Sequence, residues 1–568
     1  MQNEALDVAR SLPRFREVLR HFWRSDSGKK AGGLLASLFL LVLLVNGLNV
    51  VNSYVGRDFI TALAERKTDV FIYQSALYIT VFVASTITAV VYRYCEERLG
   101  LIWRNWYTKR LILAFLKDRT YFRLKEQGGI ENPDERITED VKSFTVTTLS
   151  FFLLIMNGTI TVIAFSGVMW TISPTLFGVT LLYSAVGSYL AMKLGRPLIS
   201  LNYSQLDKEA NFRSTLIHLW ENADAVSLAQ REEHVQRRLL KRLEDVMDVG
   251  NRVIRVHRNL GFFTTGYNYL IQVLPVLIVA PLYLNGQIEF GVITQSSMAF
   301  AHLVGAFSLI INQIQSISSF AAVIARLGAL GQVMEQAGPN GEKSTTTLQY
   351  THDDQTLSYQ RLYLRSQSEV PRELIDNLNL SIPSVTRVGI CGANEASKQA
   401  LFRATAGMYE AGSGHITRPS GQRMLFLTEH PYLPPGSLRD VLTSTSTSSN
   451  RDDAHLPAIL LALGLHQVVD RLGGIDAEKD WNTALSLPEL QLVAIAAALC
   501  AEPRMVFFNR AITALSREQT KLVFRLLADH AIGYLVIGKI EKHLESYDMI
   551  LELFEDGHWT WTQAKDSK

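Results

Sequence analysis

Six long apolar runs dominate the N-terminal half of this 568-residue chain. Each holds at least about 18–20 residues with few or no charges, the length that a helix needs to cross a hydrocarbon layer about 30 Å thick. Helices buried in a soluble core are the alternative, but six such runs exceed what a soluble core needs. The runs therefore predict a six-span helical membrane domain. They cover residues 31–56, 70–92, 147–170, 174–194, 260–286 and 290–324.

The composition excludes several classes of protein. Hydrophobic residues make up 48% of the chain and charged residues only 19%, so there is ample apolar surface to bury and disorder is excluded for most of the chain. A net charge of +2 gives no basic field for nucleic acid. Cys95, Cys391 and Cys500 are too far apart for a disulfide scaffold and lack the spacing of metal ligands. No metal site is therefore expected.

Basic residues flank the apolar runs unevenly. The first 30 residues hold seven Lys and Arg, and the segments 93–146 and 195–258 are also basic, whereas 171–173 and 287–289 lack basic residues. The positive-inside rule then places the N-terminus, both long segments and the C-terminal half in the cytoplasm. The three basic residues of 57–69 fit this orientation less well. The first run lacks a cleavage site and is expected to be a retained span.

A linker rich in Gly, Ser and Thr, residues 338–347, separates this half from a region of different pattern. Beyond it, short apolar runs typical of strands alternate with helical stretches, which predicts an α/β domain with a largely parallel sheet. The expected organisation is a cytoplasmic segment at 1–30, a six-span domain with long helical cytoplasmic loops at 31–337, the linker, and an α/β domain at 348–568.

Four stretches resemble the half-transporters of the ABC superfamily. They are WRNWYTKR at 103–110, NPDERITEDV at 132–141, FRSTLIHLWENADAVSL at 212–228, and SGHITRPSGQRMLFLTEHPYLPPGSLRDVL at 413–442. Within the superfamily they are similar to the SbmA/BacA-like peptide and vitamin transporters with a fused nucleotide domain, which are related to subfamily D. The resemblance implies an ABC-exporter-type transmembrane domain, a P-loop-NTPase-like ABC domain, and a dimer. It also implies segments that couple the two domains, with Asn132, Asp134, Glu139, Asp140, Glu221 and Asn222.

The P-loop that this resemblance implies is degraded. A P-loop needs G-x-x-x-x-G-K-[ST], in which the backbone cradles phosphates, the Lys contacts the β/γ oxygens, and the hydroxyl holds Mg²⁺. The aligned run keeps Gly392 and Lys398. Glu395 adds a carboxylate to the cradle, Ser397 replaces the last glycine, and Gln399 replaces the hydroxyl.

The other motifs are degraded as well. Glu429 stands in place of the Q-loop Gln, Ser516 in place of the D-loop Asp, and Lys539 in place of the switch His. The Walker B strand, which should end in Asp-Glu, ends in Asn509 and Arg510. The metal-binding carboxylate and the general base of the family are therefore missing.

The signature LSGGEQQR reads LSLPELQL at 485–492, with Ser486 and Gln491 kept and Leu487 in place of the first glycine. Phosphoryl transfer depends on metal placement and charge neutralisation. We therefore expect no cofactor, weak or absent ATP and Mg²⁺ binding, and negligible hydrolysis. A divergent but working ATPase is the alternative.

Lys398 is expected to form a vestigial ion pair with Glu395 or Glu429, and retained contact with phosphate is the alternative. Arg510 and Lys539 could meet the same carboxylates, which would form a salt-bridged plug where ATP should sit.

Charged residues near spans are candidate functional groups. Arg93, Glu96, Glu97 and Arg98 cluster at the inner end of the second run, where charge is also ordinary, and His302 stands alone in the sixth run, where packing is the simpler role. Other polar residues that could line a cavity are Tyr267, Asn268, Tyr269, Asn312, Gln313 and Gln315.

The resemblance implies a transporter of peptides, peptide-like antibiotics or cobalamin-type solutes in a bacterial inner membrane, with both termini cytoplasmic. Because ATP hydrolysis is expected to be negligible, a homodimer driven by a proton gradient is expected. The alternatives are the inactive half of an ATP-driven heterodimer and a membrane scaffold that no longer transports.

Overall fold

The structure is a computed structural model, and it divides the chain into two compact units, Met1–Gly341 and Glu342–Lys568. The boundary falls within the predicted linker. Each unit is described by itself below. The residues that the structure describes are 18–127, 132–309, 313–336, 347–367, 371–409, 411–443, 455–538 and 544–564.

The N-terminal unit is helical wherever it is described as regular structure. Five of its helical stretches are long and apolar enough to cross a membrane, namely α2, α3 with its continuation into α4, α5 to α6, α7 and α9. The elements are α2 (Asp26–Ala64), α3 (Thr68–Leu116), η1 (Lys117–Arg119), α4 (Thr120–Gln127), α5 (Pro133–Glu135), η2 (Arg136–Asp140), α6 (Val141–Ile172), α7 (Pro174–Glu221), α8 (Ala223–Leu228), α9 (Glu232–Leu284), α10 (Gly291–Phe307) and α12 (Ile314–Gln336).

The sixth predicted run, 290–324, is divided between α10 and α12, and residues 310–312 lie outside the described residues. Because α10 is 17 residues long, the sixth span stays a prediction. Asn312 is among the residues that are not described, and the side chain of Gln315 is not described either.

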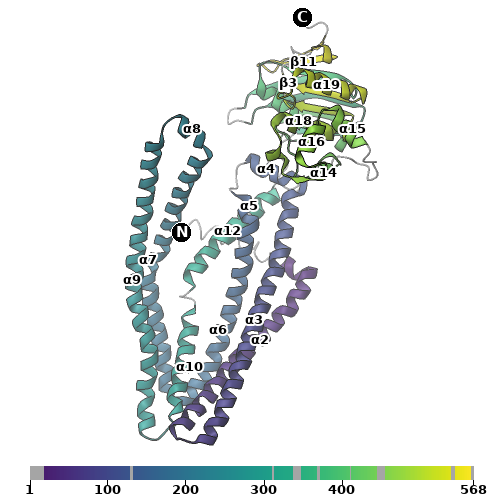
Figure 1. The fold of residues 1–568 in the computed structure, drawn as a ribbon. Helices are drawn as coiled ribbons and strands as arrows, with labels where there is room; N and C mark the ends of the chain where they lie inside the picture. The colour runs from purple at the N-terminus through teal and green to yellow at the C-terminus, as the bar shows by residue number, and fades with distance from the viewer. Residues whose placement is uncertain are drawn as a thin grey trace. The chain divides into compact units, whose positions relative to one another are not determined.

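Two pairs of long helices organise this unit: α2 packs along α3, and α7 packs along α9 (Figure 1). Helix α10 contacts α2, α6, α7 and α9, and Phe165, Phe300 and Leu303 are fully buried in the core around it. A Cβ on Gly291 would lie 1.9 Å from the carbonyl oxygen of Arg57. Only glycine therefore allows α10 to approach α2 this closely, as small residues do between membrane helices.

Two tyrosines join α7 to α9. The rings of Tyr183 and Tyr267 stack with centroids 4.4 Å apart. The hydroxyl of Tyr183 donates to the carbonyl oxygen of Tyr267 at 2.6 Å, and the hydroxyl of Tyr267 lies 3.5 Å from the carbonyl oxygen of Tyr183. Gly187 makes room for this contact, since a Cβ there would lie 2.2 Å from the Tyr267 ring.

The C-terminal unit is an α/β domain built on two main sheets. Its six-stranded sheet has the order β12-β11-β4-β10-β9-β6 and is parallel except for β12, which confirms the largely parallel sheet. The strands are β1 (Thr347–His352), β2 (Thr356–Arg365), β3 (Glu373–Pro383), β4 (Arg387–Cys391), β5 (Gly412–Arg418), β6 (Met424–Thr428), β7 (Gly436–Ser437), β8 (Glu478–Lys479), β9 (Met505–Asn509), β10 (Gly533–Ile537), β11 (Met549–Leu553) and β12 (Trp559–Gln563).

Helices flank these strands, and a four-stranded sheet of order β1-β5-β2-β3 accompanies the larger one. The strands β9 and β10 are buried along their whole length, as expected for central strands of a covered parallel sheet. The helices are α13 (Glu395–Thr405), η3 (Gly421–Arg423), α14 (Leu438–Thr443), α15 (His455–Ala462), α16 (His466–Leu472), α17 (Trp481–Ala484), α18 (Leu487–Ala501), α19 (Arg517–Asp529) and η5 (Leu544–Ser546).

Candidate functional site

The carboxyl ends of three parallel strands bring together residues of the motifs that the sequence predicts to be degraded. The strands β4, β9 and β6 belong to one sheet and run in the same direction. Glu395 follows β4, Arg510 follows β9, and Glu429 follows β6. Ligands of open α/β sheets bind at this edge, so these three side chains lie where a ligand would be expected.

The turn after β4 depends on Gly392. Its φ is +120°, and a Cβ there would lie 1.9 Å from the carbonyl oxygen of Leu553, so a side chain cannot be accommodated. Asn394 caps α13 by accepting hydrogen bonds from the N–H groups of Ala396 and Ser397. The buried hydroxyl of Ser397 donates to the carbonyl oxygen of Leu374 at 2.7 Å, which ties the start of α13 to β3.

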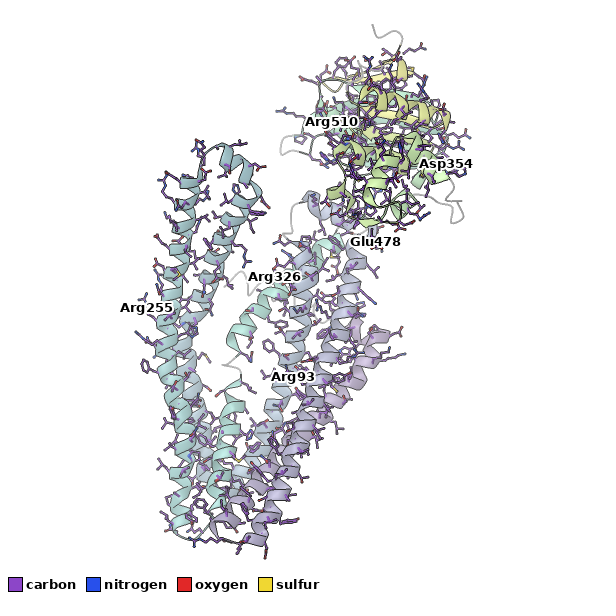
Figure 2. The ribbon with its side chains drawn as sticks, in the orientation of Figure 1. Arg93, Arg255, Arg326, Asp354, Glu478 and Arg510 are labelled. Carbon is purple, nitrogen blue, oxygen red and sulfur yellow. The ribbon has the colours of Figure 1, made fainter. Side chains whose placement is uncertain are left out.

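Glu395 is held by two cations. Lys398 Nζ lies 2.7 Å from Glu395 Oε1 and donates to the carbonyl oxygen of Gly392 at 2.8 Å. Arg510 Nη2 lies 3.2 Å from Glu395 Oε2, and Arg510 Nη1 lies 4.0 Å from Glu429 Oε2. Arg510 is labelled in Figure 2. The structure therefore contains the Lys398–Glu395 pair, and Arg510 extends it into a network; Lys539 lies outside the described residues.

The charge of Glu395 is stabilised by these partners. Partial burial opposes ionisation, but the hydrogen bond and charge of Lys398 and the charge of Arg510 hold the pKa of Glu395 below its usual value. Glu395 is therefore a carboxylate at neutral pH, and the network contains two carboxylates and two cations.

The metal-binding positions of the resemblance carry neutral side chains. Gln399 is exposed on α13, and Asn509 is buried at the end of β9. Within the described parts of the chain, no group of three or more His, Cys, Asp or Glu side chains could hold a metal ion. The residues that are present at this edge fit a bound Mg²⁺ poorly, since Arg510 adds a positive charge next to it.

Gln491 connects α18, which begins within the predicted signature, to this edge. Its Nε2 donates to the carbonyl oxygen of Glu429 at 2.8 Å, and its Oε1 accepts from the N–H of Ala514 at 3.3 Å. The side chain is buried, so it fixes two loops of the sheet edge. The sequence did not indicate this structural role.

The first turn of α18 is capped by side chains. The N–H and the hydroxyl of Ser486 both donate to Glu489 Oε2 at 2.9 Å, and Arg471 Nη2 lies 2.9 Å from Glu489 Oε1. Leu487 and Pro488 stand where the family has its glycines. A helix start whose charge is already compensated attracts a phosphate weakly.

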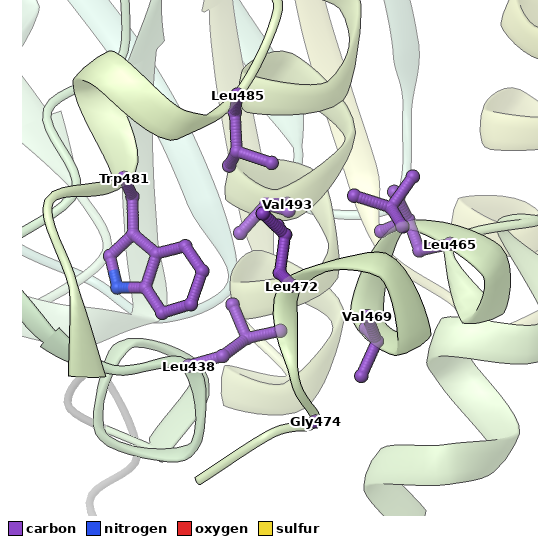
Figure 3. A pocket seen from close by; sticks show the side chains of 9 residues that line it. Leu438, Leu465, Val469, Leu472, Gly474, Trp481, Leu485 and Val493 are labelled. Carbon is purple, nitrogen blue, oxygen red and sulfur yellow. The ribbon is translucent and has the colours of Figure 1, made fainter. Parts of the chain in front are cut away.

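Ahead of this helix, Leu485 and Trp481 line a small apolar pocket together with Leu438, Leu465 and Val493 (Figure 3). Trp481 is fully buried, and its Nε1 donates to the carbonyl oxygen of Gly436 at 3.0 Å. Ser516 caps α19 in a reciprocal bond with Gln519. The residues at the predicted signature and D-loop positions therefore have structural partners.

Replacing Glu489 by Gln should lower the stability of the C-terminal unit at neutral pH by about 1 kcal/mol. Burial opposes the charge, but hydrogen bonds from Ser486 and Arg471 lower the pKa of Glu489 below the ordinary 4.5. As pH falls, the Glu489 carboxylate is protonated at a higher pH in the unfolded chain than in the folded one. Its stabilising contribution is therefore complete above about pH 4.5 and is lost as pH falls through the lower folded pKa.

Thermal unfolding of the purified full chain as a function of pH measures this effect. The difference between wild type and Glu489→Gln should narrow below about pH 4.5. Glu478→Gln, at an exposed position on β8, is the control for losing a carboxylate. A Glu489→Gln variant as stable as wild type at neutral pH would contradict the prediction.

The first predicted coupling segment is hydrogen-bonded to α12. Arg326 Nε and Nη2 donate to Asp140 Oδ2 and Oδ1 at 2.7 and 2.5 Å, and Arg136 donates to the carbonyl oxygen of Arg326. Asp140 is buried with 5% of its side chain exposed, whereas Arg326, labelled on α12 in Figure 2, is 47% exposed. The segment begins at Asn132 with a φ of +48° and ends in the π-helical turn η2.

The other predicted residues of this segment lie on its surface. Thr138 donates to the carbonyl oxygen of Asp134, and Glu139 lies 3.8 Å from Lys142. Arg326 was missed by the sequence reasoning, although a lone cation in an apolar helix could have indicated it.

The second predicted coupling segment forms the turn between α7 and α9. Helix α7 ends at Glu221, and Asn222 donates to the carbonyl oxygen of His218 at 2.9 Å. Trp220, near the end of α7, and Leu228, the last residue of α8, are 85% and 87% exposed. This tip therefore presents apolar side chains to its surroundings.

The candidate membrane residues have local partners. Arg93 pairs with Glu97 at 3.1 Å on the surface of α3, where Arg98 is also exposed. Ser150 on α6 donates to Glu96 at 3.3 Å. His302 stacks on Phe165 with ring centroids 4.3 Å apart, which favours the packing role. Asn268 and Tyr269 are exposed, and Gln313 is half-buried.

The sequence reasoning missed a buried polar cluster between α2 and α6. Asn46 donates to Asn157 at 2.8 Å and accepts from Thr161 at 2.7 Å. An asparagine within a leucine-rich run was the available signal.

Comparisons with known proteins agree on the family. Residues 22–284 match the family "ABC transporter transmembrane region 2". The chain is 33% identical to ABC transporter D family member 2, chloroplastic, of Arabidopsis thaliana, over 97% of this chain and 87% of that protein. It is 22% identical to the lysosomal cobalamin transporter ABCD4 of Mus musculus over 99% and 97% of the two chains. It is 23% identical to the inner membrane ABC transporter ATP-binding protein YddA of Escherichia coli over 90% and 92%.

With its apolar helices, its C-terminal α/β unit and this coverage, the chain belongs to the D-type half-transporters of the ABC transporter family.

Proposed function

We propose that this chain is one half of a dimeric membrane transporter whose C-terminal, P-loop-NTPase-like unit binds ATP and Mg²⁺ weakly or not at all and does not hydrolyse ATP. The observation that carries the proposal is the sheet edge at which β9 ends in Asn509 and Arg510, with Arg510 paired to Glu395. Phosphoryl transfer needs a metal-binding carboxylate and a group that positions the nucleophile. The end of β9 offers an amide and a guanidinium in their place.

The transporter is SbmA/BacA-like and works as a homodimer driven by a proton gradient. Its solutes are peptides, peptide-like antibiotics or cobalamin-type molecules, a class supported by the name of the mouse relative. It has six spans and cytoplasmic termini, and it resides in a bacterial inner membrane, as the name of the Escherichia coli relative supports. We place an interface with the second copy at the turn between α7 and α9, where Trp220 and Leu228 expose their apolar side chains.

The capped start of α18 disfavours the ATP-driven heterodimer. In such a pair, this chain would have to offer its signature helix to the ATP of the competent half. Pro488 and the Ser486–Glu489 bonds instead leave a carboxylate at the helix start, and a carboxylate repels phosphate. The chain is therefore poorly suited to complete either nucleotide site.

ATP turnover of the purified full chain in lipid tests the missing hydrolysis. Wild type and Lys398→Ala should give the same rate as protein-free lipid, because Lys398 is paired with Glu395 and β9 ends without a metal-binding carboxylate or a general base. A wild-type rate that Lys398→Ala abolishes would refute the proposal.

Uptake of labelled cyanocobalamin and of a labelled cationic peptide into proteoliposomes tests the energy source. We expect uptake that a protonophore collapses and that ATP leaves unchanged. Glu96→Gln should reduce uptake, since Glu96 is an ionisable group shared between α3 and α6, while Glu97→Gln on the exposed face of α3 is the matched control. Sealed vesicles that take up neither probe would favour the alternative that the protein is a membrane scaffold that no longer transports.

A further inference from the structure

Glu395 is an anion that two cations from different elements hold in place. Each of its carboxylate oxygens has its own partner, Lys398 at 2.7 Å on one side and Arg510 at 3.2 Å on the other. Lys398 is buried, with 7% of its side chain exposed, and its Nζ is fixed further by the carbonyl oxygen of Gly392. The cations are therefore preorganised around two oxygen atoms.

Two oxygens on a Lys and an Arg are also the pattern in which a phosphate group is bound. Lys binds phosphate as a point charge, and Arg binds two of its oxygens through a planar fork. The start of α13 adds the positive end of a helix dipole of 11 residues. The same elements would thus attract an oligophosphate if the carboxylate were absent.

We propose that the Glu395 carboxylate is a built-in occupant of an anion site formed by Lys398 and Arg510, and that this site takes oligophosphate anions without a metal once the carboxylate is removed. The inference rests on the proposed function, because it explains why the C-terminal unit leaves phosphate unbound. It goes further by assigning Arg510, which stands where the resemblance implies the general base, to anion binding.

The residues at the site explain why a metal is unnecessary. Gln399 offers no hydroxyl and Asn509 no carboxylate, so a divalent cation gains no charged ligand from them. The positive charges of Lys398 and Arg510 take the place of that cation in neutralising the phosphate. Binding is therefore expected to persist in EDTA.

The repulsion from Glu395 sets the expected size of the effect. A carboxylate about 4 Å from a phosphate oxygen weakens binding by about 5-fold in water and by about 1,000-fold at the effective dielectric of a protein surface. Because about half of the Glu395 side chain is exposed, we expect its removal to raise the affinity by about 10–100-fold. Glu429, 4.0 Å from Arg510, should oppose binding less.

Titration calorimetry of the purified full chain with inorganic pyrophosphate and with tripolyphosphate, both in EDTA, tests the inference. Glu395→Ala and the isosteric Glu395→Gln should bind, whereas wild type should bind 10–100-fold more weakly. Glu395→Ala combined with Arg510→Ala should lose this binding again. Glu518→Ala, at an acidic residue in the first turn of α19 in the same unit, is the control for removing a carboxylate from a helix start and should behave as wild type.

Equal affinity of wild type and both Glu395 variants would overturn the inference, and so would an absence of binding in a folded Glu395→Gln. A gain that needs Mg²⁺, or that survives the loss of Arg510, would also overturn it. ATP turnover measured on the same preparations separates the two proposals. Hydrolysis by wild type would refute the proposed function, whereas the metal-free affinities decide the anion site alone.

Discussion

Replacing Arg326 by Ala is expected to destabilise the N-terminal unit more than replacing Asp140 by Asn. Asp140 is buried, and both of its side-chain hydrogen bonds in the described structure come from Arg326. Arg326→Ala leaves this carboxylate buried without its cation, which costs about 3–5 kcal/mol. In Asp140→Asn the half-exposed guanidinium can turn to solvent, so the cost is about 1–2 kcal/mol.

Thermal unfolding of the full chain in detergent measures both effects. The double variant Asp140→Asn/Arg326→Ala should be more stable than Arg326→Ala alone, because it removes the unpaired charge. Arg326→Lys should be intermediate, since Lys keeps the charge but cannot form two parallel hydrogen bonds. Equal losses in the two single variants would contradict the predicted asymmetry.

Replacing Trp481 by Ala is expected to have a similarly large effect on the C-terminal unit. Trp481 is fully buried, lines the apolar pocket beside Leu485, and donates to the carbonyl oxygen of Gly436. Its removal would enlarge that pocket and leave a carbonyl without its partner, at a cost of about 3–5 kcal/mol. The melting temperature of the unit should fall on the order of 10 °C.

Scanning calorimetry of the full chain measures this shift. Tyr432→Ala is the control, because it removes an aromatic side chain of the same unit at a position that is 76% exposed, where the expected change is within about 0.5 kcal/mol. Trp481→Phe should retain most of the stability by filling the pocket. A Trp481→Ala variant with the melting temperature of wild type would contradict the prediction, because it would show that the pocket collapses without loss of stability.

Local patterns in the sequence predicted the α/β unit and part of the candidate site. The strand β9 reads as an uninterrupted apolar run because both of its faces are covered. Glu395 and Lys398 are three residues apart, so a helix places them on one face, and their ion pair could be expected. The positions of Asn509 and Arg510 could likewise be located, because the end of a buried strand is visible in the sequence as a change from apolar to polar residues.

Contacts between distant segments could not be predicted in this way. The bond from Arg326 to Asp140 joins positions 186 residues apart, and no local period records such a partner. The four-stranded sheet depends on β1 pairing with β5, which is set by tertiary packing rather than by strand propensity. The run at 290–324 contains no Asp, Glu, Lys or Arg, yet its hydropathy does not reveal that α10 ends at Phe307.

The contact between Tyr183 and Tyr267 restricts how α7 and α9 can move. Sliding one helix along the other would break the stacking and the hydrogen bond together. Bending is easier, because Pro197 in α7 and Pro275 and Pro281 in α9 remove main-chain hydrogen bonds. The two helices are therefore expected to move together and to bend near these prolines. A displacement of α8 would then be transmitted along both helices.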